Sequence, residues 1–275
     1  DINDKRKIVL LIGDSHAFML YDGLSEYIKK YNYGLLLISN SGNPPFYQDI
    51  IVSPLSTEKE IKKYRKQVDD IYRVFEFLYS KNKVDKVVFS FRFIAYYMSY
   101  DYGVLRDCSE LPNKYEYVFE EYFKDKYNYN HLNIFRKKLR DTFDYFSNKN
   151  IDFYLVLDIP NLGFEPRIYS YHFYELSNSF DKIFKLGFLF KYVDKIPYNL
   201  YYEKQGRYND FILNIAKDYP KIKIIDLSKV MCDGKYCYVI KDGNYLYLDD
   251  DHLNRIGSYY VAPYIVGNIF KNETK

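Results

Sequence analysis

The chain has 275 residues, enough to bury a sizeable core, and a single α/β domain is the default at this length. Its 40 Lys and Arg against 37 Asp and Glu give a formal net charge of +3. Because this charge is small, it gives little electrostatic attraction for a polyanion, and we expect no nucleic-acid partner. No apolar stretch approaches the ~20 residues of a membrane span, and the N-terminus lacks the apolar region of a signal peptide.

Strands and helices are predicted to alternate along the chain. Apolar runs predict five strands, at residues 8–12, 33–39, 86–91, 151–160 and 221–228. Amphipathic stretches predict helices over residues 17–31, from Thr57 to about Tyr79, over most of 114–148, over 202–219 and over 254–270, the last interrupted or bent near Pro263. This alternation predicts a three-layer α/β/α sandwich with a mainly parallel five-stranded sheet.

The first strand ends in a motif that suits a nucleophile. The run "KIVLLIGDSHAFML" (residues 7–20) is apolar up to Gly13 and becomes amphipathic after Ser15. In open α/β sheets the reactive groups gather at the carboxyl ends of the strands, and the following helix directs its free N–H groups and positive dipole end at the Ser15 hydroxyl. The alternative is that Asp14 or Ser15 only caps the helix.

A second motif, "DDDHL" at residues 249–253, supplies the base that a serine nucleophile needs. His252 follows Asp249 by three residues, so the turn can fold the carboxylate back onto the ring and fix the tautomer that accepts the serine proton. Two other interpretations remain. The segment can be an acidic run that caps the helix beside a surface histidine, or it can be a metal site. Because both motifs occur together, we predict a catalytic triad of Ser15, His252 and Asp249, with no metal.

The remaining histidines and one further carboxylate are given lesser roles. His16 follows the nucleophile directly but points away from it on the starting helix, so we expect packing or a substrate contact. His131 and His172 have no carboxylate at a supportive spacing. Asp226 ends the fifth predicted strand and is the fallback acid of the triad. An aspartate in this place more often holds the following loop.

The three cysteines allow one disulfide. Cys232 and Cys237 flank a turn at Asp233 and Gly234 that can bring the two thiols within bridging distance, so we predict a disulfide between them and a free thiol at Cys108. Free thiols in a cytosolic protein remain the alternative, whereas a metal site would need further Cys or His nearby.

The two motifs resemble the first and last blocks of the SGNH hydrolases, also called GDSL-type esterases. The order of elements is similar to that of SGNH domains fused to integral-membrane acyltransferases that O-acylate bacterial surface polysaccharides. The similar segments are "GDSHA", "GNPPF", "FRFIAYY", "CDGKYC" and "DDDHLNRIGS", which together span nearly the whole chain, although only the first and last are specific. The chain begins almost directly on a strand, as a domain excised from a longer membrane-anchored protein would.

The sequence departs from typical hydrolases of this superfamily at the oxyanion hole. Those enzymes have a Gly in the second block and an Asn in a GxND third block, but no GxND follows the third predicted strand. The expected donors are therefore the Ser15 N–H, the loop of Gly42 and Asn43, and Arg92. In the alternative interpretation, Arg92 forms a salt bridge with Asp14 or Asp158.

We expect an acyl-serine enzyme that needs no cofactor, an esterase if water accepts the acyl group and an O-acyltransferase if a sugar hydroxyl does. The resemblance implies acetyl transfer to a cell-surface or secreted glycan on the extracytoplasmic side, with the acyl group delivered by a membrane acyltransferase domain or partner. The aromatic segment 169–202 is the expected docking region for the acceptor or that partner. The alternatives are a carbohydrate acetylesterase, a non-catalytic glycan-binding module, which the missing GxND motivates, and a metal-binding domain built on the acidic run.

Overall fold

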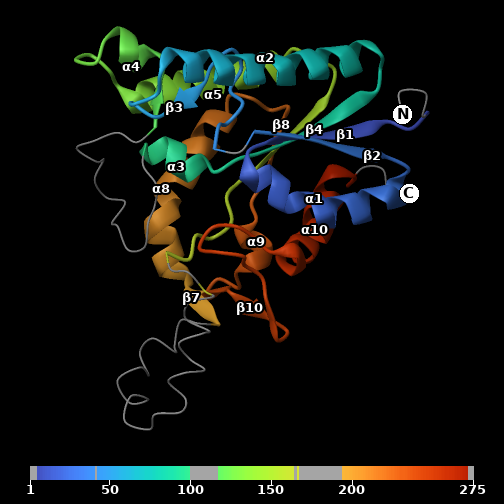
Figure 1. Ribbon diagram of the computed structural model, residues 1–275. Coiled ribbons are helices and arrows are strands. Elements are labelled where there is room, and N and C mark those ends of the chain that lie inside the picture. The colour runs from blue at the N-terminus through green and yellow to red at the C-terminus, as the bar shows by residue number, and fades with distance from the viewer. Residues whose placement is uncertain (1–4, 41, 100–116, 164–165, 167–193, 272–275) are drawn as a thin grey trace, which may run out of the picture.

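The centre of the molecule is a sheet of five strands in the order β2-β1-β4-β6-β8, in which every neighbouring pair is parallel (Figure 1). The computed structural model describes residues 5–40, 42–99, 117–163, 166 and 194–271. The strands of this sheet are β1 (Ile8–Gly13), β2 (Gly34–Ser39), β4 (Val84–Ser90), β6 (Asp152–Val156) and β8 (Ile222–Ile225). The predicted α/β class and the five parallel strands are confirmed.

Helices cover both faces of this sheet. Figure 1 shows α2 and α5 over one face and α1 and α10 over the other. The helices are α1 (Ser15–Ile28), η1 (Lys29–Tyr31), α2 (Glu58–Ser80), α3 (Phe93–Met98), α4 (Glu121–Lys124), α5 (His131–Ser147), α8 (Tyr198–Ala216), α9 (Ser228–Met231) and α10 (Arg255–Ile269). The three-layer prediction is therefore correct.

The two-residue period of a strand divides the apolar interior into two cores. In β1, Leu10 and Ile12 face the core under α2 and α5, and Val9 and Leu11 face the core under α1 and α10. Because β1 is covered on both sides, it is a continuous apolar run, as buried parallel strands are.

Among the described residues, three short antiparallel pairs lie outside the central sheet. They are β3 (Ile51–Val52) with β5 (Val118–Phe119), β7 (Lys195–Pro197) with β9 (Tyr236–Tyr238), and β10 (Ile240–Lys241) with β11 (Asn244–Tyr245). The expectation that residues 114–148 are mostly helical is confirmed for the described part of that stretch, with the strand β5 as an addition. In the described part of that stretch, β5 and the short α4 precede α5, which begins after Asn130 caps its first turn by accepting from the Asn133 N–H.

Other helix boundaries are close to those predicted. The Thr57 side chain caps α2, and Glu60 completes the predicted capping box. At the other end of the chain, α10 runs without interruption through Pro263. The predicted interruption at that proline is therefore absent, and the predicted bend there stays a prediction.

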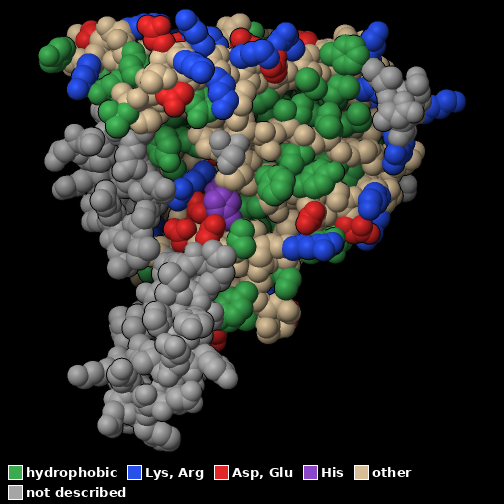
Figure 2. All heavy atoms as spheres, in the orientation of Figure 1, with side chains coloured by type: hydrophobic (Ala, Val, Ile, Leu, Met, Phe, Trp, Pro, Cys, Tyr) green, Lys and Arg blue, Asp and Glu red, His purple; other side chains and the backbone are tan. Residues whose placement is uncertain are grey.

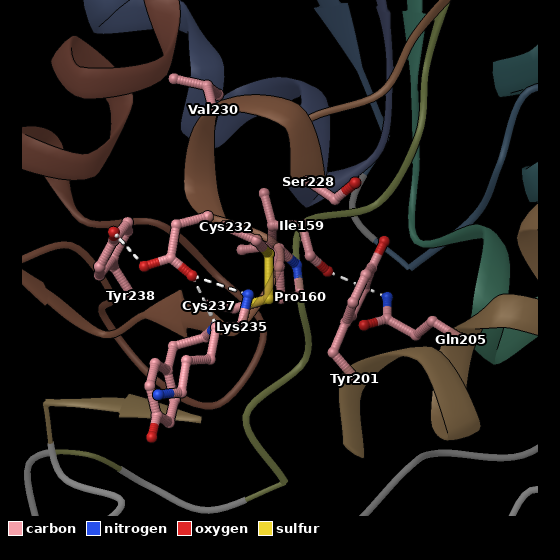
Figure 3. The surroundings of a disulfide bond; sticks show 12 residues. Ile159, Pro160, Tyr201, Gln205, Ser228, Val230, Cys232, Lys235, Cys237 and Tyr238 are labelled. Carbon is pink, nitrogen blue, oxygen red and sulfur yellow. Dashed lines mark hydrogen bonds between the residues drawn. A yellow bond between two sulfur atoms is a disulfide. The ribbon is translucent and has the colours of Figure 1, made fainter. Parts of the chain in front are cut away.

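A disulfide joins Cys232 to Cys237, as the turn between them predicted (Figure 3). The Asp233 carboxylate holds this turn, because it accepts the N–H groups of Lys235 and Tyr236 at 2.9 and 2.7 Å. The disulfide closes the segment that joins α9 to β9. Cys108, predicted to be a free thiol, lies outside the described residues.

Among the described residues, no helix combines the length and the apolar character needed to cross a membrane.

Candidate active site

The turn after β1 depends on a glycine. A Cβ on Gly13 would lie 1.6 Å from the carbonyl oxygen of Ser90, at the end of β4, and 2.8 Å from the Ala17 Cβ. Only glycine permits so close an approach of the two strand ends. The ends of β1 and β4 therefore stay together exactly where α1 begins, which sets the position of Ser15.

Asp14, rather than Ser15, is the cap of α1. One oxygen of its buried carboxylate accepts the His16 N–H at 2.8 Å. The other oxygen accepts the Arg92 N–H at 3.0 Å and the Tyr96 hydroxyl at 3.1 Å. The capping alternative therefore applies to Asp14, and the Ser15 side chain is left for another contact.

The Ser15 hydroxyl contacts His252 from the far end of the chain. Its Oγ lies 2.8 Å from His252 Nε2, and the Nδ1 of the same ring lies 3.0 Å from each carboxylate oxygen of Asp249. Side chains of His252 and Asp249 are 24% and 27% exposed, so an incoming molecule can reach them. The three residues predicted as a triad thus lie in a continuous hydrogen-bonded line.

The three-residue spacing of Asp249 and His252 has a local cause. One Asp249 oxygen accepts the backbone N–H groups of Asp251 and His252 at 3.0 and 2.7 Å, which closes a turn just before α10. That turn brings the ring of His252 against the same carboxylate. The carboxylate therefore fixes both the backbone of the loop and the tautomer of the ring.

A second aspartate, Asp251, also contacts His252, and the sequence analysis gave it no role. Its Oδ1 lies 2.8 Å from His252 Nδ1, and its Oδ2 contacts Arg92 Nε. The Arg92 guanidinium therefore pairs with Asp251, and neither Asp14 nor Asp158 is its ion-pair partner among the described contacts. The salt-bridge alternative therefore named the wrong carboxylates. The partner of Arg92 belongs to the acidic run before α10, which the fold brings to the end of β4.

His16 lies between two buried carboxylates. Its Nε2 lies 3.5 Å from Asp251 Oδ2, and its Nδ1 lies 3.7 Å from Asp158 Oδ1. Its ring centroid is 5.0 Å from that of His252. The prediction that His16 packs, and is not the base next to the serine, agrees with this geometry.

Asp158 connects the site to α3. Its carboxylate accepts the N–H groups of Phe93 and Ile94, in the first turn of α3, at 3.2 and 2.9 Å. Burial raises the pKa of Asp158 to about 6, although the neighbouring His16 opposes that shift. Figure 2 shows histidine atoms between acidic and basic side chains on one face of the molecule. The site is therefore a compact cluster of charges.

The structure describes both residues of the predicted oxyanion loop, Gly42 and Asn43. Gly42 has a positive φ of 71°, and the Asn43 N–H donates to the Asn40 carbonyl at 3.1 Å, so that N–H is already engaged. The Asn43 side-chain amide is buried, and neither of its polar atoms has a hydrogen-bond partner within the described residues. Because the Asn43 N–H is engaged, the side-chain amide is the group of Asn43 that remains to donate to an oxyanion.

The other candidates have structural roles. Burial lowers the pKa of His131 to about 4, and its Nε2 lies 2.6 Å from the Tyr96 carbonyl. Asp226 accepts the Ser228 N–H at 2.9 Å and so holds the loop after β8. His172 lies outside the described residues, as do residues 169–193 of the aromatic segment.

Within the part of the chain that the structure describes, two groups of side chains have the spacing of metal ligands: His16, Asp251 and His252, and the three aspartates 249–251. Arg92, His16 and His252 already contact Asp251, so the protein's own side chains occupy its oxygens. This donor set fits a metal less well than one whose carboxylates face an open space.

Comparisons with known proteins agree with the fold and the motifs. A family model described as "SGNH domain (fused to AT3 domains)" matches residues 1–267. No curated protein sequence matches the chain. Among solved structures, the chain is similar to the periplasmic domain of the lipopolysaccharide acetyltransferase of Salmonella ser. Paratyphi A, with 16% identity and a TM-score of 0.54 over 98% of this chain and 85% of that one. At this identity the likeness shows the fold.

Proposed function

The chain belongs to the family of SGNH domains fused to AT3 domains, and from this premise we propose that it is a serine-dependent O-acyltransferase that acts on a glycan. The family supports an enzyme of the SGNH hydrolase and acyltransferase kind. In the proposal, the acyl group is acetyl, the acceptor is a hydroxyl of a cell-surface or secreted glycan, and the group passes through an ester on Ser15. The proposed location is extracytoplasmic, with a membrane acyltransferase domain or partner as the source of the acyl group.

One observation carries the proposal: Ser15 Oγ, His252 and Asp249 lie in a hydrogen-bonded line at the carboxyl edge of the sheet. A serine and an imidazole 2.8 Å apart, with a carboxylate on the other ring nitrogen, have the arrangement of an activated nucleophile. The two halves of this line are separated by 237 positions in the chain, so the contact is a product of the fold.

The proposed reaction has two halves. Ser15 Oγ attacks the acyl carbonyl while its proton moves to His252 Nε2, and the carbonyl electron pair moves to oxygen. The tetrahedral species then expels the donor's leaving group, which takes the proton from His252. In the second half His252 accepts a proton from the glycan hydroxyl, whose oxygen attacks the acyl-serine, and Ser15 leaves with the proton.

Oxyanion stabilisation is proposed to come from groups beside the nucleophile. Ser15 is in the first turn of α1, where backbone N–H groups have no partner within the helix and the dipole favours negative charge. The Gly42 N–H and the Asn43 side-chain amide are the proposed further donors. Arg92 is the weakest candidate, because its side chain contacts Asp251.

The acceptor is proposed to be a sugar hydroxyl rather than water, with the aromatic segment 169–202 as its docking region. Within the described part of that segment, Tyr202 is 52% exposed at the start of α8. The similar solved structure is itself a lipopolysaccharide acetyltransferase domain, which supports a glycan acceptor for this chain.

The test combines hydrolysis and transfer. We expect Ser15→Ala and His252→Ala each to lower acetyl-ester turnover at least about 10³-fold, and their combination to cost little more, because residues that act as a unit are not additive. Cells that carry the Ser15→Ala protein should also lose glycan O-acetylation. The exposed Asp210→Asn, on α8, is the matched control and should change neither activity.

Three outcomes separate the candidate functions. Loss of both activities in Ser15→Ala supports the acyltransferase. Loss of ester hydrolysis with unchanged glycan acetylation makes the protein an acetylesterase. Unchanged hydrolysis and acetylation in a folded Ser15→Ala protein reject the acyl-serine mechanism and leave a glycan-binding module.

A further inference from the structure

Two carboxylates lie against the same ring nitrogen of His252. Both oxygens of Asp249 are 3.0 Å from Nδ1 with hydrogen-bond geometry, and Asp251 Oδ1 is 2.8 Å from the same atom. A ring nitrogen carries at most one proton, so it serves one acceptor well. Asp249 takes that proton, and the proposed triad leaves Asp251 without a task.

Asp251 is held where it is by its second oxygen. The residue is only 4% exposed, and its Oδ2 contacts Arg92 Nε and lies 3.5 Å from His16 Nε2. A buried carboxylate is costly unless it is paired. These partners come from α1 and from the residue before α3, so side chains from two other segments face the Asp251 carboxylate.

We propose that Asp251 is a positioning residue for acyl transfer: its Oδ1 stabilises the imidazolium form of His252, while Arg92 and His16 hold its other oxygen. This inference rests on the proposed function. When Ser15 Oγ bonds to the acyl carbon, its proton passes to His252 Nε2, and the ring becomes a cation 2.8 Å from Asp251 Oδ1. Asp249 orients the ring, and Asp251 supplies a second negative charge.

The electrostatics of the pair agree with this division. Burial alone would lower the pKa of His252, but Asp249 and Asp251 raise it to about 10. Burial alone would raise the pKa of Asp251, but His16, His252 and Arg92 hold it well below its usual range. Asp251 is therefore ionised whenever His252 exchanges a proton.

Other titratable or charged groups belong to the cluster of contacts around Asp251 and His252. They are Asp14 and His16 at the start of α1, Arg92 and Tyr96 around the start of α3, Asp158 after β6, and Asp249, Asp250 and Asp251 before α10. Of these, Asp249 and Asp251 have oxygens within 3.0 Å of the ring nitrogen. A change of charge at Asp251 should therefore have a larger effect than one at Asp250.

The test measures the titration of His252 directly, by NMR of histidine-labelled protein, with a His252→Gln spectrum to assign the signal. In Asp251→Asn the midpoint should fall by about 1 to 3 pH units, because an opposite charge beside the ring is removed. The acidic limb of kcat/KM for an acetyl ester should move in the same direction. Asp250→Asn removes the same charge one residue away and should give a smaller shift, and Asp210→Asn should give none.

Variants of Arg92 test the second half of the proposal. Arg92→Gln removes the cation beside Asp251 and should move the His252 midpoint upward, whereas Arg92→Lys keeps the charge and should leave the midpoint near that of the wild type. If Asp251→Asn does not fold, the double variant Asp251→Asn, Arg92→Gln replaces the pair by two amides. It should still lower the midpoint, because Asp251 is the nearer charge.

The outcomes separate the two proposals. An unchanged His252 midpoint in Asp251→Asn or in the double variant overturns the inference, even if Ser15→Ala is inactive and the proposed function stands. A lowered midpoint together with full turnover by Ser15→Ala leaves the charge pairing intact but rejects the acyl-transfer role of both Asp251 and Ser15.

Discussion

Asp14 and Ser15 are neighbours with separate tasks. The Asp14 carboxylate satisfies three donors: the buried His16 N–H and Tyr96 hydroxyl, and the partly buried Arg92 N–H. It therefore ties the start of α1 to the start of α3. Since the cap is supplied by Asp14, Ser15 can direct its hydroxyl at His252 without any loss to the helix.

At the residue scale we predict that Asp14→Ala is far more harmful than an ordinary cap deletion. It should lower the free energy of unfolding by about 3 kcal/mol, because it removes a helix cap and leaves buried donors unsatisfied. Misplacement of Ser15 should also lower kcat about 100-fold. Urea unfolding and ester hydrolysis measure the two effects.

Thr57→Ala, at the exposed cap of α2, is the matched control. It should cost about 1 kcal/mol and leave kcat unchanged. Equal losses in the two variants would mean that Asp14 does no more than cap its helix.

Elements that bury a full apolar face could be predicted from the sequence, whereas very short ones could not. The strands of the central sheet were found from their apolar runs, and α2 from its capping box. β3 and β5 have two residues each, too few to show a period, and their pairing joins segments 66 positions apart.

The candidate site has the same limit, because its local motifs can be recognised in the sequence but its contacts between distant segments cannot. Ser15, Asp249 and His252 belong to local motifs, but the contacts of Asp251 with Arg92 and His16 arise only from the tertiary fold.

The contact between α1 and α10 depends on one glycine. A Cβ on Gly23 would lie 2.2 Å from the Ser258 carbonyl oxygen, and the Gly23 N–H donates to Ser258 Oγ at 3.0 Å. The obstacle is backbone, which cannot turn away as a side chain can. These two helices hold Ser15 at the start of one and the loop of His252 before the other.

At the element scale, Gly23→Ala should therefore destabilise the protein by about 2 kcal/mol through overpacking, although alanine favours a helix. Gly267→Ala is the matched comparison within α10. No atom lies within 4 Å of its added Cβ, and we expect a gain of about 0.5 to 1 kcal/mol. Thermal and urea unfolding measure both. A gain of stability in Gly23→Ala would show that the helices can separate freely.

On the scale of the whole molecule, the fold gathers charges from four distant segments. Asp14 follows β1, Arg92 follows β4, Asp158 follows β6, and the acidic run precedes α10. Parallel strands end at one edge of the sheet, so these groups meet there. Burial raises the pKa of Asp158, and that of Asp250, to about 6. Below neutral pH, proton binding is thus linked to folding through several groups, these two carboxylates among them. Between neutral pH and pH 10 it is linked chiefly through His252.

This linkage gives the last prediction, on the pH dependence of stability. The pKa of His252 is about 10 in the folded protein and about 6.5 when unfolded. Between these values the folded state binds more protons, so the contribution of His252 to stability is complete below pH 6.5 and is lost as pH rises through 10. The free energy of unfolding should fall across this window by up to about 1.4 kcal/mol per pH unit.

His252→Gln should lose that slope, and Asp251→Asn should end it at a lower pH. The buried tyrosines, whose pKa values are raised well above 10 in the folded protein, contribute to the fall only near pH 10, where the unfolded chain begins to lose tyrosine protons, and they contribute equally in His252→Gln. Urea unfolding from pH 7 to 10 measures all three proteins. Parallel curves for the wild type and His252→Gln would contradict the prediction. If the slope is present, the wild type should become more active as it becomes less stable, because deprotonation of His252 both frees the base and removes the imidazolium that its two carboxylates stabilise.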